Sequence, residues 1–212
     1  MTFLTETFFE LSPFGLFTIQ DVSEVIKGSS NKIHSLIKRA IAKGEIIRLR
    51  RGLYCLPKKY LKKHINLYAV AQHIYGPSYI SLESALSWHG WIPEAVYTLT
   101  SVSFNKSKDF NTPLGLFSYN HVPQNIFYES VERHIDQEGY IFFMAKPLKA
   151  LVDYIYINKI DFDNEDFLLN SLRIEKEELN NLQSKDFDLL AANYENKRVN
   201  QFLGKIKKEL NR

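Results

Sequence analysis

The sequence predicts an α+β fold, in which an N-terminal helix-turn-helix unit is followed by a mixed sheet/helix domain with a helical C-terminus. Three observations predict it. Apolar residues recur at helical spacing up to residue 44, short apolar strands follow at 45–56 and 98–122, and helical patterns fill 159–212. The 212 residues suffice for two small domains, which we expect at 1–62 and 63–212.

Two short helices are expected first. Thr18 precedes an apolar-periodic stretch and has an acidic residue three positions later, as a capping residue would, and Gly28 ends this helix. The second helix, capped by Ser29 or Ser30 and ended by Gly44, has one apolar stripe. The stripe consists of Ile33, Leu36, Ile37, Ala40 and Ile41. Two helices around a glycine-containing turn are typical of a helix-turn-helix.

The polar face of the second helix and the hairpin after it form the candidate DNA-binding surface. At about 100° per residue, the face opposite the apolar stripe is polar and basic. Strands expected at 45–49 and 53–56 place arginines at the hairpin tip, which is typical of the wing of a winged helix-turn-helix. Such a helix can enter the major groove while the wing contacts phosphate or a narrow minor groove. The candidate DNA-binding residues are Asn31, Lys32, His34, Ser35, Lys38, Arg39, Arg48, Arg50 and Arg51.

Basic residues are concentrated in the same segment. The chain carries 27 Lys and Arg against 24 Asp and Glu, a net charge of +3. Between Lys27 and Lys63 there are twelve basic residues and one acid, so this segment carries +11, whereas the rest, with 15 basic and 23 acidic residues, carries −8. A solvated lysine-rich face would give this pattern too, but beside a helix-turn-helix it favours double-stranded DNA as a partner.

The middle of the chain is expected to form a small sheet with helices. A helix at 65–74 is followed by a short helix capped by Ser81, and strands are expected at 98–104, 110–112 and 115–122. Pro147 is placed at the start of another helix, with apolar spacing through Ile155. Beyond it, Asp161 to Asp188 holds nine acids and three bases, which a helical cap or a partner surface would explain.

The chain resembles the AbiEi antitoxin family of type IV toxin–antitoxin systems over roughly residues 15 to 160. The matching residues are Arg51, Gly52, Leu53, Tyr54, Tyr79, Ser81, Leu82, Ser84, Ala85, Leu86, Gly90, Ile92, Pro93, Glu94, Thr100, Phe110, Thr112, Gly115, Phe117, Tyr119, His121, Pro147, Lys149, Ala150, Leu151 and Asp153. The resemblance implies a winged-helix domain that represses its own operon. It also implies a second domain that neutralises a nucleotidyltransferase-like toxin, often without a stable complex between the two proteins.

Other classes of function have weaker support. The six histidines show no metal-binding i, i+4 pair, and the chain has no Walker A or Rossmann glycine pattern, so we expect no metal, no cofactor and no enzyme activity. His89 is interpreted as a packing residue. Glu195 and Lys197 have the spacing of some nucleases, which we interpret as chance. An effector-responsive winged-helix regulator and a winged-helix nuclease remain as alternatives.

The cellular setting follows from composition. A single cysteine, Cys55, cannot form an internal disulfide, which indicates a reducing compartment. No apolar run reaches the roughly 18–20 residues of a membrane span, and the N-terminal residues carry no signal-peptide charge pattern. We therefore expect a cytoplasmic protein that binds its own promoter without membrane attachment, and that can act as a homodimer on DNA.

Overall fold

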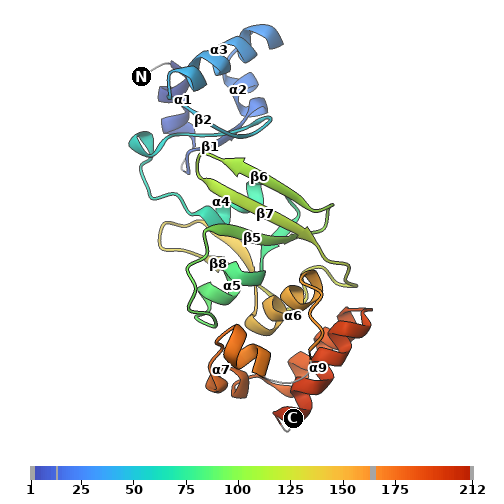
Figure 1. Ribbon diagram of the computed structural model, residues 1–212. Coiled ribbons are helices and arrows are strands. Elements are labelled where there is room, and N and C mark those ends of the chain that lie inside the picture. The colour runs from blue at the N-terminus through green and yellow to red at the C-terminus, as the bar shows by residue number, and fades with distance from the viewer. Residues whose placement is uncertain (1–2, 13, 163–165, 211–212) are drawn as a thin grey trace.

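The computed structural model describes residues 3–12, 14–162 and 166–210. It confirms an α+β protein, which contains helices and two separate β-sheets. Figure 1 shows three tiers: N-terminal helices with a small sheet at the top, a larger sheet in the middle, and C-terminal helices at the bottom.

The N-terminal tier has the element order of a winged helix-turn-helix. It consists of α1 (Phe3–Leu11), β1 (Leu16–Thr18), α2 (Ile19–Val25), α3 (Ser30–Ala42), β2 (Ile47–Arg50) and β3 (Leu53–Cys55). The strands form an antiparallel sheet in the order β1-β3-β2. The sequence did not reveal α1 or β1, because α1 has no marked capping residue and β1 is too short to show a period of two.

Capping residues set the starts of both central helices. The Thr18 hydroxyl accepts a hydrogen bond from the Asp21 amide at 3.3 Å, and the Asp21 carboxylate accepts one from the Thr18 amide at 2.6 Å. This reciprocal pair is a capping box. Ser29, rather than Ser30, caps α3 by accepting from the Lys32 amide at 3.4 Å. The predicted starts of these two helices are therefore confirmed.

The middle tier is built on a six-stranded sheet in the order β6-β7-β5-β4-β9-β8. The short helix η1 (Lys58–Tyr60) comes first and packs its Tyr60 against the N-terminal core. The elements of the middle tier are α4 (Leu67–Ile74), β4 (Ser78–Ile80), α5 (Leu82–Trp88), β5 (Thr98–Ser103), β6 (Lys108–Thr112), β7 (Gly115–His121), β8 (Val131–Ile135), β9 (Ile141–Ala145) and α6 (Pro147–Ile157). The β8–β9 hairpin was not anticipated, because β8 is an edge strand whose polar and charged residues conceal any apolar alternation.

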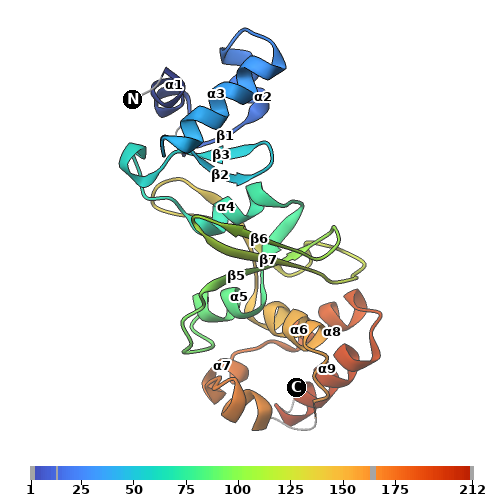
Figure 2. The same cartoon turned by 45° about the horizontal axis from the view of Figure 1, so that its top comes forward.

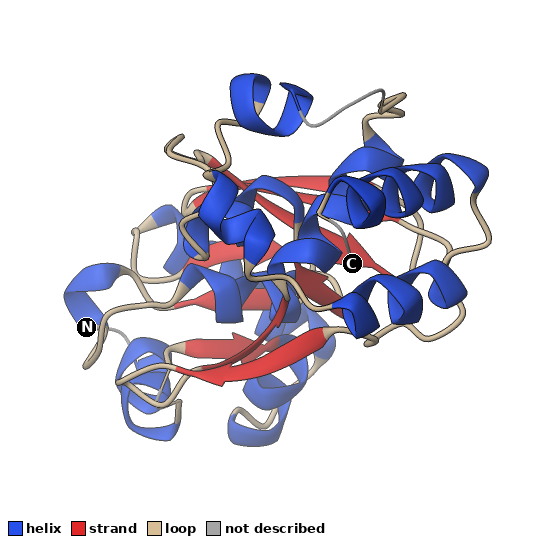
Figure 3. Cartoon of the chain, turned by 90° about the horizontal axis from the view of Figure 1, so that it is seen from below, coloured by secondary structure: helices blue, strands red, loops and turns tan. Residues whose placement is uncertain are grey.

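The C-terminal tier is helical, as expected. It comprises η2 (Phe167–Ser171), α7 (Lys176–Asn180), α8 (Ser184–Asn193) and α9 (Lys197–Glu209). Helix α9 buries Val199, Phe202, Leu203 and Ile206 along one side. Figure 2 shows α8 and α9 beside α6, and Figure 3 shows helices flanking the strands. None of the described helices is long and apolar enough to span a bilayer.

Strand β3 belongs to two hydrophobic cores. Its Leu53 and Cys55 are buried in the core of the middle tier, together with Leu49 of β2. Tyr54, which points the other way, and the following Leu56 are buried in the core of the N-terminal tier. Alternate side chains of a strand point to opposite faces, so this short strand is buried on both sides. The two cores meet at β3, before the predicted domain boundary at 62 and 63.

Candidate nucleic-acid interface

Helix α3 presents a continuous polar face to solvent. Ile33, Ile37 and Ala40 are buried against the N-terminal core, so the residues between them point outward. The six predicted α3 residues are all exposed: Asn31, Lys32, His34, Ser35, Lys38 and Arg39. Their local contacts are made within the helix: His34 Nδ1 lies 2.8 Å from the Ser30 carbonyl oxygen, and Arg39 Nε donates to the Ser35 carbonyl at 3.4 Å.

Two wing arginines lie beside this helix. Arg48 of β2, Arg51 of the wing turn and His34 of α3 line one shallow hollow, together with Ile19, Gly52 and Tyr54. Gly52 has a φ of +80°, a conformation that glycine adopts without strain and that closes the turn between β2 and β3. The fold therefore brings the basic end of the wing to the polar face of α3.

Arg50 lies elsewhere. The pairing of β2 with β3 shifts between Arg48 and Arg50, which leaves Leu49 as the extra residue of a bulge. The Arg50 guanidinium donates to the carbonyl of Arg51 at 3.1 Å and to that of His73, at the end of α4, at 3.5 Å. Its side chain thus reaches the middle tier, whereas Arg48 and Arg51 face α3. The prediction placed all three arginines on the DNA-binding surface, because no residue in the sequence indicates the bulge.

The polar face of α3 and the two arginines beside it define what we call the α3–wing surface. It consists of Asn31, Lys32, His34, Ser35, Lys38, Arg39, Arg48 and Arg51. In the described part of the chain, no ion pair engages its lysines or arginines. Their charges are therefore available to an anionic partner, and they lie on a helix and an adjacent hairpin, the two elements by which winged helices in general contact duplex DNA.

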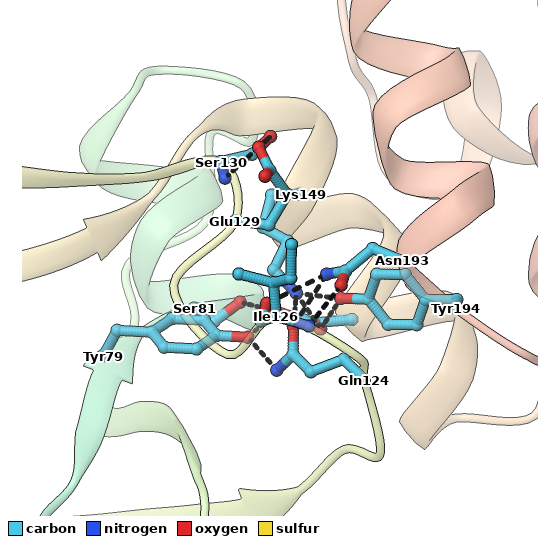
Figure 4. A network of polar contacts seen from close by, with 10 residues as sticks. Tyr79, Ser81, Gln124, Ile126, Glu129, Ser130, Lys149, Asn193 and Tyr194 are labelled. Atoms are coloured by element: carbon cyan, nitrogen blue, oxygen red, sulfur yellow. Dashed lines mark hydrogen bonds and ion pairs between the residues drawn. The ribbon is translucent and has the colours of Figure 1, made fainter.

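A second polar assembly, which the sequence did not reveal, lies buried between the middle and C-terminal tiers. Figure 4 shows Tyr79, Gln124, Lys149 and Tyr194 converging from separate elements. Lys149 Nζ donates to the Gln124 side-chain oxygen at 2.5 Å and to the Tyr194 hydroxyl, and it lies 3.3 Å from the Asp153 carboxylate one helical turn along α6. We call these residues, with Ser81 and Asn193, the Lys149 cluster.

Asp153 is the shared acceptor of the Lys149 cluster. It accepts from Ser81 Oγ at 2.7 Å, from the Tyr79 hydroxyl at 3.1 Å and from the Tyr194 hydroxyl at 2.5 Å. Ser81 occupies the N-cap position of α5, as predicted, but its hydroxyl makes no capping hydrogen bond because it donates to Asp153.

Burial perturbs the ionisable groups of the Lys149 cluster. It lowers the pKa of Lys149, against the opposing effect of the Asp153 carboxylate. Burial, and then the negative charge of Asp153, raise the pKa of Tyr79 and of Tyr194. Lys149, Asp153, Tyr79 and Ser81 have no exposed surface. A ligand cannot reach these groups in this conformation, so the cluster serves to dock α8 and the loop at 122–130 onto α6.

The histidines lie apart from any metal-binding arrangement. Among the described residues, no three His, Cys, Asp or Glu side chains are grouped to hold an ion. His89 is partly buried, as expected for a packing residue: its Nε2 lies 2.9 Å from the Ala145 carbonyl oxygen, and the Trp88 ring packs edge-on against it. Glu195 precedes α9 in a connecting segment, away from any strand.

Comparison with known families gives a match within the N-terminal tier. Residues 6–57 match the model of a family described as transcriptional regulator, AbiEi antitoxin. The match extends from α1 to the end of β3, so it includes the whole α3–wing surface. It covers 52 of the 212 residues and confirms the resemblance in this part of the chain; the resembling residues from Tyr79 onward lie outside the match. No curated protein matches the chain.

Proposed function

We propose that the protein is an antitoxin that represses its own operon by binding duplex DNA through the α3–wing surface and that neutralises a nucleotidyltransferase-like toxin. One observation carries the DNA-binding half. Eight exposed polar and basic residues of α3 and the wing share a surface without internal ion pairs, inside the region that matches a family of transcriptional regulators.

The two parts of the surface have different roles in this proposal. The exposed face of α3 enters the major groove, where Asn31, Ser35 and Lys38 can read base edges. Arg48 and Arg51 contact the phosphate backbone at the side of the groove and fix the register of the helix. Arg50, whose guanidinium donates to the His73 carbonyl at 3.5 Å, is directed towards the middle tier and is given no base or phosphate contact in this proposal.

The salt dependence of binding to the DNA upstream of the gene tests the interface. The α3–wing surface contains five lysines and arginines: Lys32, Lys38, Arg39, Arg48 and Arg51. If they neutralise about five phosphates, the logarithm of affinity should fall with the logarithm of salt concentration at a slope of roughly −4 to −5. Arg51→Ala should weaken binding to every duplex and make the slope shallower by about 1. Fluorescence anisotropy with the upstream DNA and with a scrambled duplex measures the affinity and its salt dependence.

Lys38→Ala tests the base-reading role of α3. We expect it to weaken binding to the upstream DNA more than binding to the scrambled duplex, by about 1–3 kcal/mol if Lys38 contacts a base. Lys185→Ala is the matched control, because Lys185 is an exposed lysine of α8, far from the N-terminal tier. Unchanged affinity in both Lys38→Ala and Arg51→Ala would exclude this surface as the DNA interface.

The antitoxin half of the proposal rests on the family match together with the size of the rest of the chain. Residues beyond 57 form a six-stranded sheet with a helical cap, which a DNA-binding unit alone does not require. We expect the variant Lys38→Ala with Arg51→Ala to lose repression of a promoter reporter but still to restore growth of cells expressing the neighbouring toxin gene. Failure of the intact, folded protein to restore growth would replace the antitoxin with an effector-responsive repressor.

A further inference from the structure

An apolar groove beside the α3–wing surface is left open by the residues that the structure describes. It lies between α1 and α3, has a volume of about 270 Å³, and is lined by Phe3, Leu4, Leu36, Ala40, Arg39 and Lys43. Phe3 stands at its edge with 64% of its surface exposed, although a phenylalanine at a helix surface gains most from burial. The groove therefore presents an aromatic side chain next to an open apolar floor.

The charges around the groove are segregated. On α1, Phe3, Glu6 and Glu10 follow the spacing i, i+3 and i+7, so they share the outer face of the helix. On α3, Arg39 and Lys43 border the groove. None of these four charged side chains forms an ion pair in the part of the chain that the structure describes. The outer face of α1 is thus acidic and aromatic, whereas the groove is apolar with a basic rim.

We propose that the occupant of this groove is a second copy of the chain. Because both surfaces belong to one protomer, a two-fold axis lets each copy place its α1 on the groove of the other. Phe3 of one copy then covers Leu36 and Ala40 of its partner copy, and Glu6 and Glu10 face the basic rim. The proposal concerns self-association in the absence of DNA, so it does not depend on the proposed repressor function.

The arrangement has a consequence for DNA recognition. The groove adjoins α3, so the dimer holds two recognition helices near its symmetry axis. A symmetric dimer of this kind reads an inverted repeat. Arg39 belongs both to the groove and to the α3–wing surface, so a change there would also affect DNA binding. Lys43 belongs to the groove alone, and its charge is therefore the one reversed in the experiment.

Sedimentation velocity at increasing protein concentration tests the proposal. We expect a monomer–dimer equilibrium for the intact chain. Glu6→Lys with Glu10→Lys, and separately Lys43→Glu, should each weaken dimerisation by roughly tenfold or more, because like charges then meet across the axis. An equimolar mixture of the two variants should recover part of the lost affinity, since one of its two contacts between α1 and the groove is then the wild-type one and the other sets the introduced lysines against the introduced acid.

Two substitutions on α1 separate the groove from the rest of the helix. Phe3→Ser should abolish dimerisation, whereas Leu11→Ser, the matched control, should not. Leu11 is 61% exposed but does not line this groove. Both side chains are exposed, so neither variant should unfold the protein, and circular dichroism verifies this.

Several results would overturn the proposal: a monomer at every concentration, dimers that all the variants leave unchanged, or charge variants that do not recover on mixing. If Phe3→Ser abolished binding of the toxin while the intact chain remained monomeric, the groove would belong to the toxin instead. Binding of the Phe3→Ser variant to a single half-site duplex, tested in parallel, reports on the DNA-binding proposal alone, because a half-site needs only one copy.

Discussion

Replacing Asp153 with alanine is expected to lower the free energy of unfolding by about 3–5 kcal/mol, because it leaves the buried ammonium of Lys149 without its counter-charge. The same change removes the acceptor of three buried hydroxyl groups, those of Tyr79, Ser81 and Tyr194. Each buried donor left without a partner adds a desolvation penalty. Urea unfolding followed by circular dichroism measures the loss.

The partner substitution should be less harmful. Lys149→Met keeps most of the side-chain volume and removes the buried cation, while Asp153 still accepts hydrogen bonds from the three hydroxyls. We therefore expect Asp153→Ala to be the more destabilising of the two, although both remove the same ion pair. Equal losses would mean that the ion pair, and not the hydroxyl network around Asp153, dominates the stability of the cluster.

The pH dependence of the Asp153→Ala variant provides an independent check. Burial already lowers the pKa of Lys149, and Asp153 is the main group that opposes this effect. Without Asp153 the folded-state pKa falls further, so between that pKa and the ordinary lysine value of 10.5 the unfolded chain binds more protons than the folded one. Stability then rises with pH. The deficit of the variant relative to wild type should shrink from neutral pH towards pH 10.5, and a deficit that does not change would exclude a charged Lys149 as its cause.

The features that the sequence predicted are those set by neighbouring residues. Thr18 and Ser29 begin α2 and α3 through contacts three residues away, and the polar face of α3 follows from helical geometry alone. Gly52 and the short strands were also enough to predict the hairpin. The hollow that contains Arg48 and Arg51 depends in addition on how this hairpin packs beside the helix.

The missed features depend on distant contacts. Ser81 was expected to cap α5, but a carboxylate 72 positions away takes its hydroxyl. Arg50 was grouped with the other wing arginines, but a bulge and a carbonyl 23 positions away direct it to the middle tier. Sequence periodicity has no information about such long-range pairings, because they exist only once the sheet and its helices have assembled.

The shared strand β3 predicts that residues 1–63 will not fold stably when separated from the rest of the chain. Leu49 and Leu53 are each at most 4% exposed, and both lie against the core of the middle tier. Exposing them forfeits roughly 1.5–3 kcal/mol for each side chain. A folded unit of about 60 residues has a small free energy of unfolding, which such a loss would largely remove. We therefore expect the fragment to be unfolded or aggregated, and to bind DNA far more weakly than the intact chain.

A fragment variant shows whether the lost contacts are the cause. Leu49→Thr with Leu53→Thr introduces β-branched side chains, which favour strands, and removes the exposed apolar surface, so this fragment should be less prone to aggregate than the unchanged one. Adding residues 64–212 in trans should restore helical signal and DNA binding to the unchanged fragment, because the second piece supplies the apolar surface that β3 needs. It should not help the threonine variant, whose polar side chains no longer fit that surface. If the unchanged fragment instead folded alone and bound the upstream DNA as tightly as the intact chain, β3 would not couple the two cores, and the DNA-binding unit would be an independent domain after all.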